Sequence, residues 1–387
     1  MNLEPTILVF SPSADGGIAE HTLYQANALE KAGAKVLCLV PPAFLHGRAT
    51  EFAKVICLAD AVPAGGLESV RRARLAWRTI SSRWTLAWEI IKQQPDLVLL
   101  DSYVEYLAPL WVWPHWLLAR LAGVKYAANL HDPVRSYIVG PAWWHWLSVR
   151  LAYLPLDFVL VHDKLPDPSP VPANVRAVEV PHGLYEIRGH ERDPSALRCE
   201  WGVQNGQRVF LAFGFVRDDK NLHVAIRALA HVPEAFLVVA GSVAASKDKP
   251  FAFYRDLAAE VGVEDRCQFF EGFVADADLG EYFAGADFVL LTYASSFRSQ
   301  SGVLNIAARA RKPVLASASP SSLMESVTRF SLGVAVKPDC VEAVVAGMRR
   351  LIGACPSSRW DAYEASASWA ANARKVCEAA GLPVNDS

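Results

Sequence analysis

The segment FGFVRDDKNL, from Phe213 to Leu222, decides the fold that the sequence predicts. It leaves an apolar, β-branched run, passes through a glycine turn and enters an apolar helical pattern, which is one strand-to-helix step of a parallel α/β sheet. Arg217 and Lys220 stand at the start of that helix, where positive charge opposes the helix dipole unless an anion lies between them. The segment therefore predicts a phosphate site. The alternative is that Asp218 and Asp219 pair with the two cations on a solvated turn.

A second loop of the same kind is YASSFRSQSGVLNIAA, from Tyr293 to Ala308. Ser301 is placed to cap the following helix, and the amides of Gly302 and Val303 are placed to receive a phosphate. An ordinary helix cap is the alternative interpretation. Because both loops follow strands of one predicted sheet, they converge at its carboxyl edge and together predict a diphosphate pocket.

The same alternation of short apolar runs and helical patterns extends over the whole chain and predicts two doubly wound, Rossmann-like α/β domains. The predicted strands are Thr6–Phe10, Lys35–Val40, Asp96–Leu100, Lys125–Asn129, Phe158–Val161, Arg208–Phe215, Phe236–Ala240, Gln268–Phe270, Phe288–Tyr293, Pro313–Ala316 and Gly333–Val336. The predicted division is an N-terminal domain over 1–180, a linker over 181–205 that follows the proline-rich stretch LPDPSPVPANV, a C-terminal domain over 206–355 and a helical tail over 356–387.

Composition fits a folded cytoplasmic protein of two domains. The 387 residues are 52% hydrophobic and 20% charged, which is enough apolar material for two cores. The net charge of -2 gives no general attraction to nucleic acid. The seven cysteines are scattered without a CxxC pair, which indicates reduced thiols, and the first residues do not resemble an export leader.

Three short motifs of the N-terminal half are candidates for binding. Gly16 and Gly17 follow the first strand and let backbone amides approach an anion, although a tight turn needs the same residues. His131 and Asp132 follow another predicted strand, and His182 lies in the predicted linker. Each of these has a structural alternative, since a single histidine is more often structural than catalytic.

No pattern in the sequence predicts a metal cofactor. Asp276 and Asp278 form a DxD pair, but they precede an apolar helical pattern, so helix capping is the favoured interpretation. HExxH, GxSxG, Walker and GxGxxG motifs do not occur.

Two tryptophan-rich segments, from Tyr106 to Gly123 and from Ala142 to Val161, approach the length of a membrane span. Pro114, Arg120 and Arg150 within them argue against spanning. Two interpretations stay open: buried helices of the N-terminal domain, or a surface that rests in a membrane interface through Trp111, Trp113, Trp116, Trp143, Trp144 and Trp146.

Several of these segments resemble glycosyltransferase family 4 and its GT-B relatives. In the first half the similar segments are GGIAEHTLYQANALEKAG, ANLHDP and VPHGLY; in the second half they are FGFVRDDKNLHVAIRAL, FFEGFVADADLGEYFAGADFVLLTY and SQSGVLNIAARARKPVLAS. The resemblance implies a GT-B architecture in which two Rossmann-like domains face a central cleft and the tail packs back across it. It also implies Arg217, Lys220 and Ser301–Val303 on the donor diphosphate, with His131 near the transferred sugar.

One departure from the family concerns two Glu residues that many members carry eight positions apart. Ser299 and Ala307 occupy those positions here, while Glu325 resembles a family Glu near the same cleft. The resemblance implies a retaining transferase of polysaccharide biosynthesis that uses a nucleotide sugar and a glycan or lipid-linked acceptor, without a cofactor or metal. The tryptophan-rich segments add the expectation of a lipid-linked acceptor, with the cytoplasmic protein in peripheral contact with the inner membrane face. The alternatives are a nucleotide-sugar epimerase of GT-B fold and a non-catalytic sugar-nucleotide-binding subunit.

Overall fold

The structure, a computed structural model, describes residues 4–14, 16–44, 52, 54–58, 68–101, 105, 107–131, 140–162, 165, 169, 171–187, 192–244, 248–298 and 300–384. The chain forms two compact units. The first comprises Met1–Gly183 and Ala367–Ser387, and the second comprises Leu184–Ser366. Each unit is built around its own parallel sheet.

The first unit has a seven-stranded sheet in the order β3-β2-β1-β4-β5-β6-β7. Its strands are β1 Thr6–Phe10, β2 Lys35–Val40, β3 Lys54–Cys57, β4 Leu97–Leu100, β5 Lys125–Leu130, β6 Phe158–Val161 and β7 Arg176–Glu179. All the pairings are parallel; β1, for example, aligns Thr6 with Lys35 of β2 and Ile7 with Leu97 of β4. The strand order reverses direction on either side of β1, so the loops after β1 and β4 flank a switch point.

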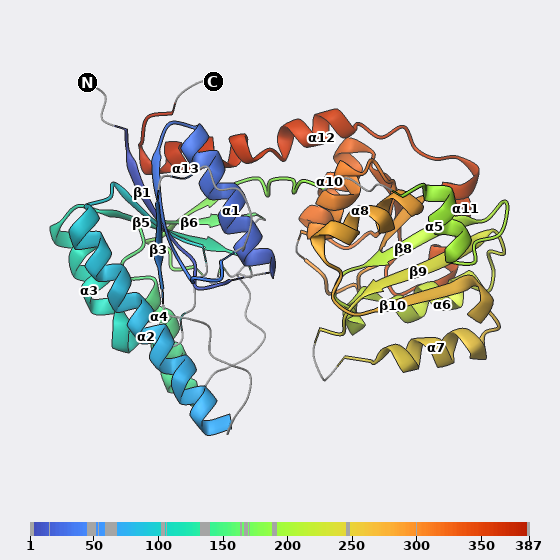
Figure 1. Cartoon of the computed structure of the whole chain (residues 1–387), viewed down its shortest axis with the longest axis horizontal. Helices are drawn as coiled ribbons and strands as arrows, with labels where there is room; N and C mark the ends of the chain where they lie inside the picture. Colours follow the sequence, from blue (N-terminus) through green and yellow to red (C-terminus); the bar gives the residue numbers. More distant parts are fainter. Residues whose placement is uncertain are drawn as a thin grey trace. The chain divides into compact units, whose positions relative to one another are not determined.

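Helices cover both faces of this sheet (Figure 1). Alternate residues of β1 enter different cores: Ile7 and Val9 pack with α1 (Gly16–Lys31) and α13 (Trp369–Ala380). Leu8 and Phe10 pack with α2 (Glu68–Gln93), α3 (Ala108–Leu121) and α4 (Ala142–Ala152). This double burial explains why the central strands are continuous apolar runs.

The second unit has a six-stranded parallel sheet in the order β10-β9-β8-β11-β12-β13. Its strands are β8 Arg208–Phe213, β9 Ala235–Gly241, β10 Cys267–Glu271, β11 Phe288–Leu291, β12 Val314–Ser317 and β13 Gly333–Val336. Its helices are α5 Pro194–Glu200, α6 Leu222–Leu229, α7 Phe251–Glu260, α8 Asp276–Gly285, α9 Gly302–Arg309, α10 Ser322–Phe330, α11 Val341–Gly353 and α12 Trp360–Ser366, with short 3₁₀ turns η1 Asp218–Lys220 and η2 Glu264–Arg266. The order reverses at β8, so the loops after β8 and β11 flank its switch point.

The prediction of two doubly wound parallel sheets is confirmed, and every predicted strand is present. Two strands, β3 and β7, were not predicted. Residues 181–205, predicted as a linker, include α5, which packs on α8 in the second unit. The predicted tail divides between the units: α12 packs on α9 and α10, whereas α13 packs on α1.

The described helices include none long and apolar enough to cross a membrane. In the tryptophan-rich segments, Trp111 is buried in the core of the first unit. Trp113, Trp143 and Trp146 are exposed. The interpretation as buried helices therefore holds for Trp111, and the membrane interface stays a prediction for the exposed tryptophans.

Candidate active site

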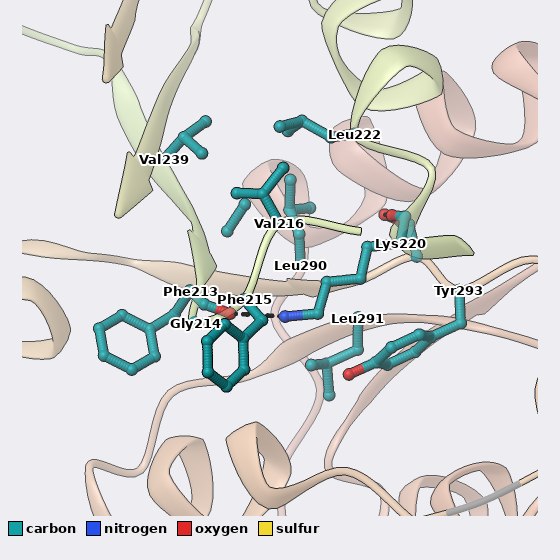
Figure 2. A pocket seen from close by; sticks show the side chains of 12 residues that line it. Phe213, Gly214, Phe215, Val216, Lys220, Leu222, Val239, Leu290, Leu291 and Tyr293 are labelled. Atoms are coloured by element: carbon teal, nitrogen blue, oxygen red, sulfur yellow. Dashed lines mark hydrogen bonds between the residues drawn. The ribbon is translucent and has the colours of Figure 1, made fainter. Parts of the chain in front are cut away.

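The loop after β8 brings a lysine back onto the end of its own strand. Gly214 ends the strand with a φ of 85°, and the Lys220 ammonium donates a hydrogen bond to the Phe213 carbonyl oxygen at 2.9 Å (Figure 2). Burial, followed by the charge of Arg217, lowers the pKa of Lys220 to about 8. Among the described residues, no carboxylate forms an ion pair with Lys220. This cation is held in place and left uncompensated.

Arg217 behaves differently from Lys220. Its Nε lies 3.1 Å from Asp219 Oδ1, and both side chains are 42% exposed. Asp218 accepts hydrogen bonds from the Lys249 ammonium at 2.8 Å and the Lys249 amide at 3.0 Å. The alternative in which the aspartates pair with nearby cations therefore applies to Arg217 and does not apply to Lys220.

The loop after β11 meets the same turn. An added Cβ on Gly214 would lie 3.7 Å from Lys220 Nζ and 3.9 Å from Val303 Cγ2, so the lysine and the start of α9 flank one glycine. The first-turn amides of a helix have no partners within the helix, which leaves the Gly302 and Val303 N–H groups available to an anion. The structure thus brings Lys220, Gly302 and Val303 together at the switch point of the second sheet.

Ser301 stands at the N-cap position of α9, but the prediction that it caps the helix is wrong. Its side chain makes no capping hydrogen bond, and its buried hydroxyl lies 2.8 Å from the Tyr293 hydroxyl. The Tyr293 ring stacks on Phe297 with a centroid distance of 3.9 Å. The serine therefore fixes the loop, and the anion-binding potential rests with the backbone amides.

Asp339, which the sequence analysis missed, ties the two loops together. Its carboxylate accepts from Asn221 Nδ2 at 2.7 Å and from the Ser295 amide at 3.0 Å. The hydrogen bonds from Ser295 and Asn221 lower the pKa of Asp339. Asp339 comes shortly after β13, which the sequence predicts as a strand. A polar residue just after that strand is the sequence feature that could have identified it.

The remaining predicted positions of the second unit lie around this edge. Glu325 is in the first turn of α10, and Gln300 reaches that helix through a 3.4 Å hydrogen bond to Ser326. Ala307 is fully buried in α9, and Ser299 lies outside the described residues.

The capping role predicted for the DxD pair is wrong, because the N-cap of α8 is Ala275. Asp278 falls in the first turn of that helix, where an acidic side chain favours the dipole.

In the first unit, Gly16 and Gly17 begin α1, and Gly16 has a φ of 75°. Among the described residues outside the chain neighbours and the backbone of α1, no heavy atom lies within 4 Å of a Cβ added at either glycine. Asp132, the neighbour of His131, lies outside the described residues.

A buried carboxylate, Asp101, organises the carboxyl edge of the first sheet. It follows β4 and accepts hydrogen bonds from the Thr22 hydroxyl, from His21 Nδ1 at 2.8 Å and from Asn129 Nδ2 at 2.6 Å. His131 follows β5; its Nε2 lies 3.1 Å from the Asp101 carbonyl oxygen. Burial alone would raise the pKa of Asp101, but the His21 and His131 imidazoles lower it.

His162 and His182 complete a group of four histidines at this edge. The His21 ring centroid lies 4.6 Å from that of His131, 5.2 Å from that of His162 and 5.5 Å from that of His182. Burial lowers the pKa of His182 to about 3 and that of His162 well below its ordinary value. Burial also lowers the pKa of His21, against the opposing effect of Asp101. The His21, His162 and His182 rings are therefore neutral at physiological pH.

The structure thus joins predicted residues, His131 and His182, to unpredicted ones, His21, Asp101 and His162. Asp101 and His162 each directly follow a strand that the sequence predicts, which was the signal for them. His21 gave no such signal because it lies inside α1.

Comparison with known proteins identifies the class of the second unit. Residues 195–376 match the family described as glycosyl transferases group 1. No curated protein sequence matches the chain.

Solved structures share the fold over almost the whole chain. A glycosyltransferase from Rickettsia africae has a TM-score of 0.71 and 14% identity, with 97% of this chain and 98% of that chain covered. Sucrose-phosphate synthase from Thermosynechococcus elongatus has a TM-score of 0.65 and 17% identity, with the same coverage. The Anabaena protein HepE, in complex with UDP-glucose, has a TM-score of 0.62 and 19% identity, with 98% of this chain and 95% of that chain covered.

At these identities the structural likeness establishes the fold, which is GT-B. The group 1 glycosyl transferase model matches residues 195–376. The chain is therefore an enzyme of the glycosyltransferase class.

Proposed function

We propose that the enzyme is a retaining transferase of the family 4 type, which moves a sugar from a nucleoside diphosphate donor to a hydroxyl of a glycan or lipid-linked glycan. The observation that carries the proposal is the meeting of Lys220 with the first turn of α9 around Gly214. A partly buried ammonium without a carboxylate partner, beside open helix amides, is suited to a diphosphate. HepE, which has the same fold, is described in complex with UDP and with UDP-glucose, which supports a nucleotide sugar as donor.

In the proposed reaction the bond between the anomeric carbon and the diphosphate oxygen breaks as a bond to the acceptor oxygen forms on the same face. The acceptor proton passes to the departing diphosphate. Lys220, Arg217 and the α9 amides stabilise the charge that develops on the leaving group, and they are already oriented before the reaction begins. These groups supply the positive charge, so the mechanism requires no metal. His131 donates or accepts a hydrogen bond at the transferred sugar.

The test is nucleotide binding and turnover by Arg217→Ala and Lys220→Ala. The first step is a thermal-shift screen of the wild type with UDP, GDP, ADP and dTDP sugars, since a bound donor raises the apparent stability. With the best donor, each variant is expected to weaken binding by about tenfold or more, at 1.4 kcal/mol per tenfold change. Lys312→Ala is the matched control. Lys312 is also a partly buried lysine beside a carbonyl, 3.5 Å from Ala284 O, but it precedes its strand. Unchanged binding and turnover in both test variants would remove the proposal.

Fully buried Ala307 favours one alternative, a subunit that binds a sugar nucleotide without turning it over. A Glu at this helical position is typical of the family that the sequence resembles. Donor binding without transfer to any acceptor of a broad panel, and without hydrolysis, would support this alternative.

We also propose that the first unit contacts the cytoplasmic face of a membrane, where a lipid-linked acceptor would lie. Trp77, Trp84 and Trp88 on α2 are 71%, 53% and 66% exposed, and their spacing puts them on one side of the helix. The helices α3 and α4 lie in the same layer over the sheet as α2 (Figure 1), and they carry the exposed Trp113 and Trp143. Clustered exposed tryptophans are typical of membrane interfaces.

Charge on α2 favours an anionic surface. Arg71, Arg72 and Arg74 are exposed at the beginning of this helix, and each basic residue near an anionic bilayer contributes about 1 kcal/mol. The test is flotation with phosphatidylglycerol vesicles of the wild type and of a Trp77→Ala, Trp84→Ala, Trp88→Ala variant. Phe273→Ala, at an 80% exposed aromatic of the second unit, is the control. Equal flotation of all three proteins would contradict the membrane contact.

A further inference from the structure

The four histidines at the carboxyl edge of the first sheet come from different parts of the fold. His131 and His162 directly follow β5 and β6, His182 comes shortly after β7, and His21 projects from α1. One nitrogen each of His21, His131 and His162 lies within 4.8 Å of the other two. The topology thus gathers three imidazoles, separated by up to 141 positions in the sequence, into one group.

Hydrogen bonds fix which nitrogen carries the proton in two of these rings. His21 Nδ1 faces the Asp101 carboxylate at 2.8 Å, and His162 Nδ1 faces the Val180 carbonyl oxygen at 3.3 Å. Both partners only accept hydrogen bonds, so each Nδ1 bears the hydrogen. The Nε2 atoms of His21 and His162 consequently present lone pairs.

Those two Nε2 atoms are buried and have no hydrogen-bond partner among the described residues. His21 is only 1% exposed. A buried polar atom without a partner costs about 1–3 kcal/mol, and such atoms in native proteins call for a water, an ion or a functional role. One cation bound by His21, His162 and the neighbouring His131 would give both Nε2 lone pairs a partner.

We propose that His21, His131 and His162 bind a divalent transition metal ion of the zinc class. Imidazole nitrogens suit Zn²⁺, Ni²⁺ and Cu²⁺, and three of them leave a fourth position open. His182 packs against His162 with a ring centroid distance of 4.9 Å. Asp101 and the Val180 carbonyl fill the outer role that orients metal-binding histidines, by holding the opposite ring nitrogen.

This site is separate in composition from the diphosphate site, and it shares only His131 with the proposed sugar contact. It belongs to the first unit, and none of the residues proposed to hold the diphosphate contributes to it. The transfer reaction proposed above takes no step through the metal. Metal binding can therefore be measured without donor, acceptor or turnover, and failure of either proposal leaves the other intact.

The experiment is calorimetric titration of the metal-free, full-length protein with Zn²⁺, repeated with Co²⁺ and followed by absorption spectroscopy. We expect one Zn²⁺ per chain and a Co²⁺ spectrum of a nitrogen-ligated ion without sulfur-to-cobalt charge transfer. His21→Gln and His162→Gln are expected to weaken Zn²⁺ binding at least 100-fold. Asp101→Asn, which changes only the outer partner, is expected to weaken it about 10–100-fold.

The control variant is His231→Gln, at an exposed histidine of the second unit, and it is expected to bind zinc like the wild type. Circular dichroism of each variant checks folding. If one variant fails to fold, the other ligand variant decides. The proposal is overturned if the wild type binds no Zn²⁺, if both ligand variants keep wild-type affinity, or if Co²⁺ shows thiolate ligation, which would assign the metal to cysteines.

Discussion

Replacing Lys220 with Met should make the protein more stable and a poorer binder of nucleotides. Burial lowers the pKa of this lysine from its ordinary 10.5 to about 8, which at 1.36 kcal/mol per pKa unit is a cost of about 3 kcal/mol for keeping the charge in the folded state. Losing the hydrogen bond to the Phe213 carbonyl offsets about 1 kcal/mol of the gain. The net stabilisation of ~2 kcal/mol corresponds to a rise in Tm of about 4–8 °C for a unit of this size.

Nucleotide binding should change in the opposite direction. A hydrogen bond between an ammonium and a phosphate contributes about 1.5–3 kcal/mol, so Lys220→Met should weaken binding about 10–100-fold. Differential scanning fluorimetry gives the Tm at pH 7, and calorimetry gives the affinity for whichever of UDP, GDP, ADP and dTDP shifts the wild type most. Lys312→Met, at the opposite edge of the sheet, should leave affinity unchanged. A Lys220→Met protein that is less stable yet binds normally would refute the reasoning, because the lysine would then be structural.

Three further outcomes follow from the same structure. Wild-type nucleotide affinity should fall as the pH rises from 7 through about 8, because the protonated form of Lys220 binds the anion. Calorimetry should show this fall lost in Lys220→Met. Gly241→Ala should prevent folding of the second unit, since its Cβ would lie 1.9 Å from the Gly214 carbonyl oxygen. Gly262→Ala, at a φ of 68° and without a contact within 4 Å among the described residues, should lower the free energy of unfolding by about 1 kcal/mol; denaturant titration measures both. Asn372→Ala should destabilise the first unit by about 1–3 kcal/mol in the same titration, because it leaves the Pro181 carbonyl, 2.8 Å away, without its donor.

The sequence predicted the sheets well because their central strands are buried on both faces and read as unbroken apolar runs. Arg208–Phe215 was predicted too long at one end, since Gly214 turns with a positive φ and ends β8 at Phe213. β7, Arg176–Glu179, was missed because it is a short strand at the sheet edge whose residues are mostly exposed. Its sequence, RAVE, carries neither the apolar run nor the alternation from which strands are recognised.

The candidate sites were predictable only as far as backbone topology decides them. Parallel strands end at one edge, so the meeting of the loops that carry Lys220 and Val303 followed from the strand order. The partner of each side chain did not follow: Ser301 bonds to Tyr293 instead of capping its helix. His21 could not be assigned to a site, because its partner Asp101 is 80 positions away in the sequence.

The two proposals make opposing demands on His131. To contact the sugar, His131 must direct a ring nitrogen at the substrate. To bind the metal, it must direct the lone pair of a ring nitrogen at the cation. Its side chain is 24% exposed, in contrast to the buried His21, so a sugar can reach it. Zinc should therefore inhibit transfer, with half-inhibition near the dissociation constant from titration, measured as nucleoside diphosphate release. In His162→Gln, normalised to its own zinc-free rate, the inhibition curve should move to at least 100-fold higher zinc. Identical curves for the two proteins would place the inhibiting ion elsewhere, and full activity of a zinc-saturated wild type would show that His131 does not contact the sugar.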